Sequence, residues 1–325
     1  MSHSSSTESE RDDARWLVTH PVSNKDSLAV ARLRSAVAPA KGLFDGVAGR
    51  ERYNALMEAS PVAVGVSFEP ATIGGIAGWW ARPGGVSSGD AAVVYVHGGW
   101  FTWGTAAAFR NVGGHIALAA GAPTFLPEYR LAPEYRFPAG VRDLEACYGG
   151  LLEQGIARIA IAGDSAGGNL ALVLASVASA QARHSGSKPV GAVVFSPITD
   201  LSLSGDSYRT RADADLYFTK DEAATLVQNY LGGSDMTNSL ASPLLGDLSG
   251  LPPIRVHVGD NEVLLDDARR YVQKAVAAGV DATLDVWMGM PHGFALNVGM
   301  FDASAEALQS SGAFLAERLG RTSAQ

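Results

Sequence analysis

The rest of this sequence is interpreted from one short stretch, residues 163–168, Gly-Asp-Ser-Ala-Gly-Gly. The apolar run 156–162 before it has the length of a buried strand, and residues 169–182 after it are rich in Ala and Leu, as in a buried helix. The pattern G-x-S-x-G therefore predicts that Ser165 sits on a tight strand-to-helix turn, with glycines where neighbouring backbone approaches closely. An ordinary glycine-rich loop is the alternative, because the chain has 37 glycines.

The composition is that of an ordinary globular protein, with 47% apolar and 18% charged residues in a chain of 325. The net charge of −8 argues against nucleic acid or an anionic membrane as the main partner, since both would be repelled. Cys147 is the only cysteine, so no internal disulfide forms and a reducing compartment is expected. Residues 1–13 are polar and acidic, and no window is apolar enough to span a membrane. We expect a disordered tail on a cytoplasmic protein.

The alternation of strands and helices predicts an α/β fold. Residues 14–60 show two or three helical stretches broken by prolines and no strand signal. From residue 61 onward, eight strands alternate with helices, which predicts a mostly parallel eight-stranded sheet with helices on both faces. Sites in such sheets gather at the carboxyl ends of the strands. The strands are expected at 62–68, 76–81, 91–96, 124–126, 156–162, 190–195, 254–258 and 282–287, and the main helices at 106–120, 139–154, 169–182, 264–278 and 303–319.

Residues 199–250 interrupt this alternation with a polar, acidic segment that has one clear helix, near 221–230. The segment is too long for a plain connection, and Leu216 and Phe218 are more apolar than a linker requires. We therefore expect a mainly helical cap at 199–250, packed with the N-terminal helices of 14–60, over a catalytic domain formed by 61–198 and 251–325.

A serine hydroxyl needs a base to become a good nucleophile, and the base needs an orienting carboxylate. In folds with this turn, the partners follow the serine in the order acid, then histidine. His184 ends the helix that leaves the turn, and His257 falls inside a predicted strand, where a structural role is expected. His292 follows the last predicted strand and is the base by elimination.

The acid is expected in the loop after strand 254–258, which offers Asp260 and Glu262. Either carboxylate could hold the imidazole in the required tautomer and stabilise its charged form. The spacing leaves both candidates open.

Residues 97–100, His-Gly-Gly-Trp, follow the strand 91–96 and are expected to complete an oxyanion hole. The backbone N–H groups of Gly99 and Trp100, together with that of Ala166, would stabilise the developing negative charge. A metal or phosphate loop is the alternative, but no second ligand stands at metal spacing and no lysine follows. We expect no metal and no cofactor.

Six ordered segments resemble the bacterial hormone-sensitive-lipase-like (family IV) carboxylesterases of the α/β-hydrolase fold, from about residue 62 to the C-terminus. The resemblance implies that Glu262 is the acid, because residues 262–268 align with the D-P-L-x-D-E-A segment of that family. It also implies that the Y-R-L-A-P-E segment, residues 129–134, is scaffold. The six segments are VYVHGGWFTWGT, EYRLAPEYRFPAG, IAGDSAGGNLAL, SPITDL, EVLLDDA and MPHGFAL.

Trp100 departs from the family, which usually has a third glycine at this position. A tryptophan offers its N–H, but its backbone cannot reach the glycine-only conformations cheaply. Its indole is expected to narrow an acyl pocket that Phe101 and Asp164 also line. Short acyl chains or compact cyclic esters would then be preferred.

The resemblance implies a serine carboxylesterase that hydrolyses small, uncharged short-acyl esters through an acyl-enzyme. The alternative is a lactone hydrolase that opens cyclic esters of the terpene or caprolactone type with the same triad. A non-catalytic small-molecule receptor would be expected to lack a triad member, whereas every part is present. A true lipase is not expected, because no strongly amphipathic lid is evident. Relatives often pair through the last strand and helix, so a homodimer is left open.

Overall fold

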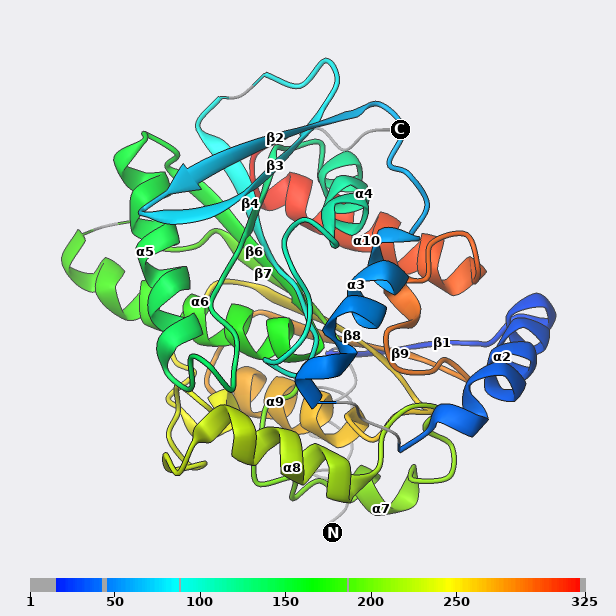
Figure 1. Ribbon diagram of the computed structural model, residues 1–325. Coiled ribbons are helices and arrows are strands. Elements are labelled where there is room, and N and C mark those ends of the chain that lie inside the picture. Colours follow the sequence, from blue (N-terminus) through cyan, green and yellow to red (C-terminus); the bar gives the residue numbers. More distant parts are fainter. Residues whose placement is uncertain (1–15, 43–45, 88, 186, 322–325) are drawn as a thin grey trace, which may run out of the picture.

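A nine-stranded sheet forms the centre of the fold, in the order β1-β9-β8-β7-β6-β4-β5-β3-β2 (Figure 1). The computed structural model describes residues 16–42, 46–87, 89–185 and 187–321, so the tail expected at 1–13 lies outside the described residues. Only β3 runs antiparallel to both of its neighbours, β2 and β5, and the other pairings are parallel. The strands are β1 (Leu17–His20), β2 (Val66–Ile73), β3 (Ile76–Pro83), β4 (Ala91–Val96), β5 (Thr124–Pro127), β6 (Arg158–Asp164), β7 (Gly191–Phe195), β8 (Ile254–Gly259) and β9 (Ala282–Trp287).

The prediction of eight strands, with none in residues 14–60, is wrong because β1 adds a ninth. Its four residues pair in parallel with the outer edge of β9, from Leu17 opposite Leu284 to His20 opposite Trp287. The sequence LVTH is short and mostly exposed, so it lacks the apolar run that marks a buried strand. These residues form a strand because they pair with β9, rather than because of their own sequence.

The first predicted strand is displaced along the chain: β2 begins at Val66 rather than at residue 62. Val64 is 84% exposed, and Gly65 turns the chain with a φ of +86°. Gly74 and Gly75, with φ values of +57° and +79°, form the two-residue turn that pairs β2 with β3. Pro70 is tolerated inside β2 because this strand forms the edge of the sheet.

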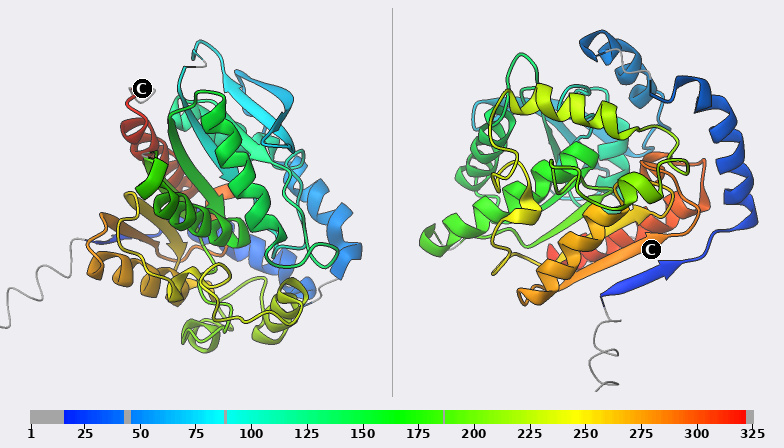
Figure 2. Two further views of the ribbon diagram at one scale, coloured as in Figure 1. Left: turned by 90° about the vertical axis from the view of Figure 1, so that its left-hand side faces the viewer. Right: turned by 90° about the horizontal axis from the view of Figure 1, so that it is seen from below.

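Helices cover both faces of the sheet, as predicted (Figures 1 and 2). Along β4, alternate residues contribute to two separate cores, one shared with α5, α6 and α9 and the other with α4 and α10. The described helices are α2 (Asn24–Val37), α3 (Arg50–Glu58), α4 (Arg110–Ala120), α5 (Ala139–Glu153), α6 (Ser165–Ser185), α7 (Ser207–Thr210), α8 (Lys220–Leu231), α9 (Leu265–Ala277) and α10 (Asp302–Arg318), with short 3-10 helices η1 (Ala38–Ala40), η2 (Gly46–Gly49), η3 (Pro243–Leu245) and η4 (Phe294–Leu296).

Residues 199–250, which we call the β7–β8 segment, carry α7, α8 and η3 and lie at the end of the sheet where the parallel strands finish (Figure 1). The predicted helix near 221–230 is present as α8, which begins with a capping box between Thr219 and Glu222. In α8, Tyr230 stacks on Phe101 of the loop after β4, with ring centroids 3.8 Å apart. The division of the chain into a catalytic domain and a cap stays a prediction.

The N-terminal helices lie beside the β7–β8 segment (Figure 2). The Arg34 guanidinium donates to the carbonyl oxygen of Asp213 at 3.1 Å, and the Lys41 ammonium donates to those of Ala212 and Asp215 at 2.6 Å. These bonds join residues that are far apart in the sequence at the strand-end side of the sheet. Across the part of the chain that the structure describes, no helix is long and apolar enough to cross a membrane.

Candidate active site

Ser165 is the first residue of α6 and follows β6 directly. Its φ of +54° lies in the left-handed region, which non-glycine residues adopt rarely and at a cost. A Cβ atom on Gly163 would lie 2.5 Å from the carbonyl oxygen of Gly167, and one on Gly167 would lie 2.1 Å from that of Val96. Both glycines are therefore required by close backbone approach, which is the reason that the sequence pattern indicated.

His292 lies in the turn after β9, and its Nδ1 is 2.6 Å from Oε2 of Glu262. Glu262 is fully buried, and its other oxygen accepts hydrogen bonds from the Ser196 hydroxyl at 2.7 Å and the Gly259 N–H at 2.6 Å. Both carboxylate oxygens are therefore fixed in place. Glu262 accepts a hydrogen bond from the protonated Nδ1 of His292. The Nε2 atom of the same ring is therefore unprotonated and available for a second partner.

Asp260, the alternative that the spacing left open, has a different partner. Its carboxylate accepts a hydrogen bond from the backbone N–H of Gly289, which lies in the turn after β9. The structure thus brings Glu262, rather than Asp260, to His292. His257 lies fully buried in β8, as expected for a structural residue, and the side chain of His184 lies outside the described part of the chain.

Asp164 anchors the loop 97–100 to the turn that carries Ser165. Its Oδ1 accepts hydrogen bonds from the Gly98 N–H at 2.9 Å and from the Tyr95 hydroxyl at 2.7 Å. Burial raises the pKa of Asp164 to about 6, although both bonds favour its charged form. Asp164 was expected to line the substrate pocket, and no sequence pattern predicted these contacts with the loop.

Trp100 and Phe101 both adopt left-handed backbone conformations, with φ values of +51° and +60°. Such conformations cost roughly 1–2 kcal/mol per residue but do not require glycine. The glycine-only conformation belongs to Gly99, with a φ of +112° and a hypothetical Cβ only 2.3 Å from the Trp103 carbonyl oxygen. This explains how the chain tolerates a tryptophan at the departure from the family pattern. Within the described ranges, the backbone N–H groups of Gly99 and Trp100 donate to no protein acceptor.

The indole of Trp100 is buried beside the candidate base. Phe218 from the β7–β8 segment packs edge-on against Trp100, with centroids 5.2 Å apart, and edge-on against His292, with centroids 5.0 Å apart. Phe101 turns instead toward α8, where it stacks on Tyr230. Phe218 therefore links the Trp100 indole of the loop after β4 to the ring of His292.

Negative charges around His292 decide its protonation. Burial lowers the pKa of this histidine, but Glu262 first, and then Asp215 and Asp164, outweigh burial and raise it. Asp164, the residue directly before Ser165, is thus one of the charges that act on His292. Among the described residues no hydrogen bond joins the Ser165 hydroxyl to the His292 ring. Both side chains are almost fully buried, with 5% of Ser165 and 9% of His292 exposed.

The Y-R-L-A-P-E segment contacts the site as a scaffold. The Tyr129 hydroxyl donates to the carbonyl oxygen of His97 at 2.8 Å, which supports the loop 97–100 from behind. Arg130 forms a bidentate ion pair with Asp143, and Glu134 pairs with Arg50 at 2.7 Å. The arginine and the glutamate thus tie the segment to α5 and α3 rather than to the reacting groups.

Ser196 was missed by the sequence analysis, although it lies in the SPITDL segment. Its φ of +47° is left-handed, and its position directly after β7 aims the hydroxyl at Glu262. The available signal was its place at the end of a predicted strand. Strand ends carry many polar residues, so that signal alone does not single it out.

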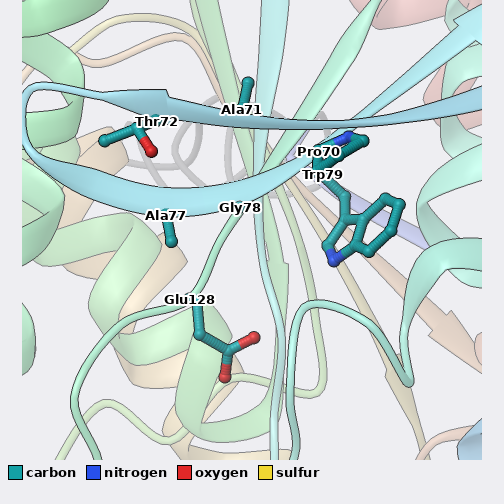
Figure 3. A pocket seen from close by; sticks show the side chains of 7 residues that line it. All are labelled: Pro70, Ala71, Thr72, Ala77, Gly78, Trp79 and Glu128. Atoms are coloured by element: carbon teal, nitrogen blue, oxygen red, sulfur yellow. The ribbon is translucent and has the colours of Figure 1, made fainter.

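A pocket of about 330 Å³ lies between the β2–β3 hairpin and the end of β5 (Figure 3). None of the candidate-site residues lines it, and its one ionisable residue, Glu128, accepts a hydrogen bond from the Ala106 N–H at 2.8 Å. Over the described ranges, no group of three or more His, Cys, Asp or Glu side chains could hold a metal ion. The site therefore consists of the groups at the strand ends.

Comparison with known proteins gives a consistent result. A family model described as alpha/beta hydrolase fold matches residues 93–296. An acetyl-hydrolase from Streptomyces hygroscopicus is 38% identical over 253 residues, which are 77% of this chain and 82% of that protein. The carboxylesterase NlhH of Mycobacterium tuberculosis is 34% identical over 227 residues, 66% of this chain and 70% of its own.

Among solved structures, a crystal structure of an esterase from the bacterial hormone-sensitive lipase family superposes with a TM-score of 0.83. It is 35% identical and covers 92% of this chain and 99% of its own. The chain therefore belongs to the α/β-hydrolase fold family and, within it, to the bacterial hormone-sensitive-lipase-like esterases. It is a carboxylic ester hydrolase, as the resemblance implied.

Proposed function

We propose that this chain is a serine carboxylesterase that hydrolyses small, uncharged short-acyl esters through an acyl-enzyme on Ser165. The observation that carries the proposal is the 2.6 Å contact between His292 Nδ1 and Glu262 Oε2, at the sheet edge where the strained serine turn lies. Such a contact fixes the tautomer that can take a proton on Nε2, and it stabilises the imidazolium that results.

In the proposed mechanism, the Ser165 oxygen attacks the ester carbonyl carbon while its proton passes to Nε2 of His292. The N–H groups of Gly99, Trp100 and Ala166 stabilise the oxyanion of the tetrahedral intermediate. The intermediate collapses to the acyl-enzyme, and the leaving alkoxide takes the proton from His292. Water then attacks the acyl-enzyme and gives a proton to His292, which forms a second tetrahedral intermediate. Collapse of this intermediate releases the carboxylic acid and returns the proton from His292 to Ser165. Glu262 stays ionised throughout.

The serine mechanism is tested by covalent labelling. A small fluorophosphonate is expected to inactivate the enzyme with one label per chain, and peptide mapping by mass spectrometry should place that label on Ser165. Ser165→Ala is the matched control and should take up no label. Labelling at another serine, with activity lost in step, would contradict the mechanism.

The short-acyl preference rests on Trp100, whose buried indole and its neighbour Phe218 leave little room beside the reacting groups. Two relatives named acetyl-hydrolase or putative acetyl-hydrolase agree with a small acyl group. In a series of p-nitrophenyl esters, kcat/KM should be highest for short chains, and a rise beyond about eight carbons would contradict the proposal. Trp100→Gly, which restores the family residue, should shift the optimum to longer chains.

A compact pocket would also suit a cyclic ester, so lactone hydrolysis is the second candidate. Trp100 would limit the length of a linear acyl chain, but a compact ring of similar volume would still fit beside it. Ring-opening of caprolactone and hydrolysis of linear acetates, compared by kcat/KM on one enzyme preparation, separate the two. A clear preference for caprolactone would replace the linear ester as the proposed substrate.

A further inference from the structure

We propose that Asp215 is a positioning residue for the ester hydrolysis: its buried carboxylate joins the β7–β8 segment to the loop of Glu262 and holds Phe218 against His292. The inference rests on the proposed function, because it concerns how the proposed base is surrounded. No sequence motif marked Asp215, which lies in the acidic stretch R-A-D-A-D-L-Y-F.

Three backbone N–H groups bind the Asp215 carboxylate, which is fully buried. Its Oδ1 accepts from Tyr217 at 2.8 Å and from Phe218 at 2.9 Å, and its Oδ2 accepts from Val263 at 2.9 Å. A buried carboxylate without partners would be strongly unfavourable, whereas one bound by several N–H groups is held firmly in one orientation. Val263 directly follows Glu262, so the carboxylate connects two segments that are distant in the chain.

The consequence of these bonds is the position of Phe218. Its ring stands edge-on to His292 at 5.0 Å and edge-on to Trp100 at 5.2 Å. The Phe218 N–H is held by Asp215, so the backbone from which the ring extends toward His292 is fixed by a charge-assisted hydrogen bond. Asp215 therefore positions the residue whose ring packs on the proposed base.

The same turn is also held from outside. The Asp215 N–H donates to the Arg211 carbonyl oxygen at 2.8 Å, and the Asp215 carbonyl oxygen accepts from Lys41 at 2.6 Å. Arg34 donates to the carbonyl oxygen of Ala214. The carboxylate bonds thus close a turn that the N-terminal helices already fix, which makes Asp215 the link between that turn and Val263.

Among the described residues, three carboxylates from three elements act on the charge of His292: Glu262 after β8, Asp164 at the end of β6, and Asp215 from the β7–β8 segment. All three raise the pKa of His292 against the effect of burial. The phenols near Asp215 are Tyr217 and Tyr208. The pKa of Tyr217 is raised to about 12 and that of Tyr208 well above its usual value, mainly by burial, so both stay neutral.

These contacts give two separable effects for Asp215→Asn. Loss of the negative charge lowers the pKa of His292, so the acidic limb of kcat/KM against pH should move to lower pH by about 0.5–1 unit. Loss of the firm bonds lets Phe218 shift, so kcat/KM on the pH plateau should fall on the order of tenfold to a hundredfold. A merely structural residue would lower stability and leave the acidic limb in place.

The matched control is Asp200→Asn, at another buried carboxylate of the same segment. Asp200 accepts hydrogen bonds from Ser202 and Ser204 within its own turn and pairs with Arg270 at 3.0 Å. Its replacement should lower the melting temperature without moving the acidic limb. Phe218→Leu removes the ring and keeps all three carboxylates. This variant should change kcat/KM on the pH plateau without moving the acidic limb of the profile to lower pH.

The experiment measures pH profiles for p-nitrophenyl acetate, with circular dichroism and thermal unfolding of every variant. An unmoved limb in Asp215→Asn, or an equal shift in Asp200→Asn, would overturn the inference. If Asp215→Asn does not fold, the inference is decided by Val263→Pro. This variant removes one of the three N–H donors to the Asp215 carboxylate and should lower kcat/KM on the pH plateau. Retained activity in Ser165→Ala would instead overturn the proposed function, so the two failures are distinguishable.

Discussion

Two buried sets of one serine, one histidine and one carboxylate can be compared within the part of the chain that the structure describes. The first lies at the ends of the strands, and the second lies between β8, β9 and α10. In the second, His257 Nε2 is 2.9 Å from the Ser311 hydroxyl, and its Nδ1 is 3.9 Å from an oxygen of Asp285. The strand-end group is Ser165, His292 and Glu262, and the sheet group is Ser311, His257 and Asp285.

Hydrogen-bond direction separates the two groups. In the sheet group, the indole N–H of Trp287 donates to Nδ1 of His257 at 3.2 Å, so the ring carries its proton on Nε2 and donates it to Ser311. That histidine cannot accept a proton from its serine. In the strand-end group, Nδ1–H of His292 donates to the Glu262 carboxylate, which leaves Nε2 of His292 as an acceptor.

The carboxylates differ as well. Asp285 is already satisfied by Arg255 and His20, each at 2.7 Å, whereas no cation other than His292 bonds to Glu262 in the described structure. Burial lowers the pKa of His257 to about 4, while the surrounding carboxylates raise that of His292. The comparison teaches that residue types alone do not distinguish the two groups: the direction of the histidine hydrogen bonds and the unneutralised acid do.

The sharpest way to break the comparison is to remove each serine. Ser165→Ala should lower kcat on the order of 10⁴- to 10⁶-fold, because the nucleophile is lost. Ser311→Ala should keep activity and lower the free energy of unfolding by about 1 kcal/mol, the loss of one buried hydrogen bond. Steady-state kinetics and urea unfolding measure both, and a large activity loss in Ser311→Ala would overturn the distinction.

Replacing each acid gives the next largest effect. Glu262→Gln should lower kcat by about 10²- to 10⁴-fold, because the amide no longer fixes the tautomer or stabilises the imidazolium. Asp285→Asn should leave kcat nearly unchanged but destabilise the fold by about 2 kcal/mol, since Arg255 loses its counter-charge. Kinetics with thermal unfolding on the same samples test this, and equal kcat losses in both variants would contradict it.

The activity of the wild-type enzyme should depend on pH through His292. A general base must be neutral, so kcat/KM should fall as the pH drops through its pKa, which lies above the usual 6.5. The measurement is a pH profile of kcat/KM for an uncharged ester. An acidic limb well below pH 6.5 would show that the carboxylates do not outweigh burial.

Protein stability should respond to His257 in a different pH window. With a pKa near 4 in the fold and 6.5 when unfolded, His257 binds its proton more readily in the unfolded chain between these values. The stability that neutral His257 contributes is therefore complete above pH 6.5 and is lost as the pH falls toward 4. The stability difference between wild type and His257→Gln should shrink over that range, and urea unfolding at several pH values measures it.

The sequence was sufficient for those parts of the site that depend on local geometry. Ser165 and the two glycines around it follow from a turn that admits no Cβ atom, and His292 follows from its place after the last strand. Glu262 needed the family resemblance, because Asp260 stands two residues away in the same loop. The structure distinguishes them by partners from another part of the chain: Glu262 meets Nδ1 of His292, whereas Asp260 accepts a hydrogen bond from the Gly289 N–H.

Other features depend on partners that no local pattern reveals. Asp215 looks like any acidic residue in a polar stretch until the fold brings the Val263 N–H to it. Trp100 looked costly at a glycine position, but the glycine-only conformation falls on Gly99 instead. In both cases the deciding contact joins residues whose proximity exists only after folding.

The pairing of β1 with β9 has a consequence for how the chain is made. The bond from His20 to Asp285 joins residues 265 positions apart, so the first strand of the described chain pairs with its last. Because such distant contacts form late, β1 must wait unpaired through most of synthesis. A ribosome that stalls before residue 282 would leave both this strand and the outer edge of β8 without their final neighbour, as a target for quality-control proteases.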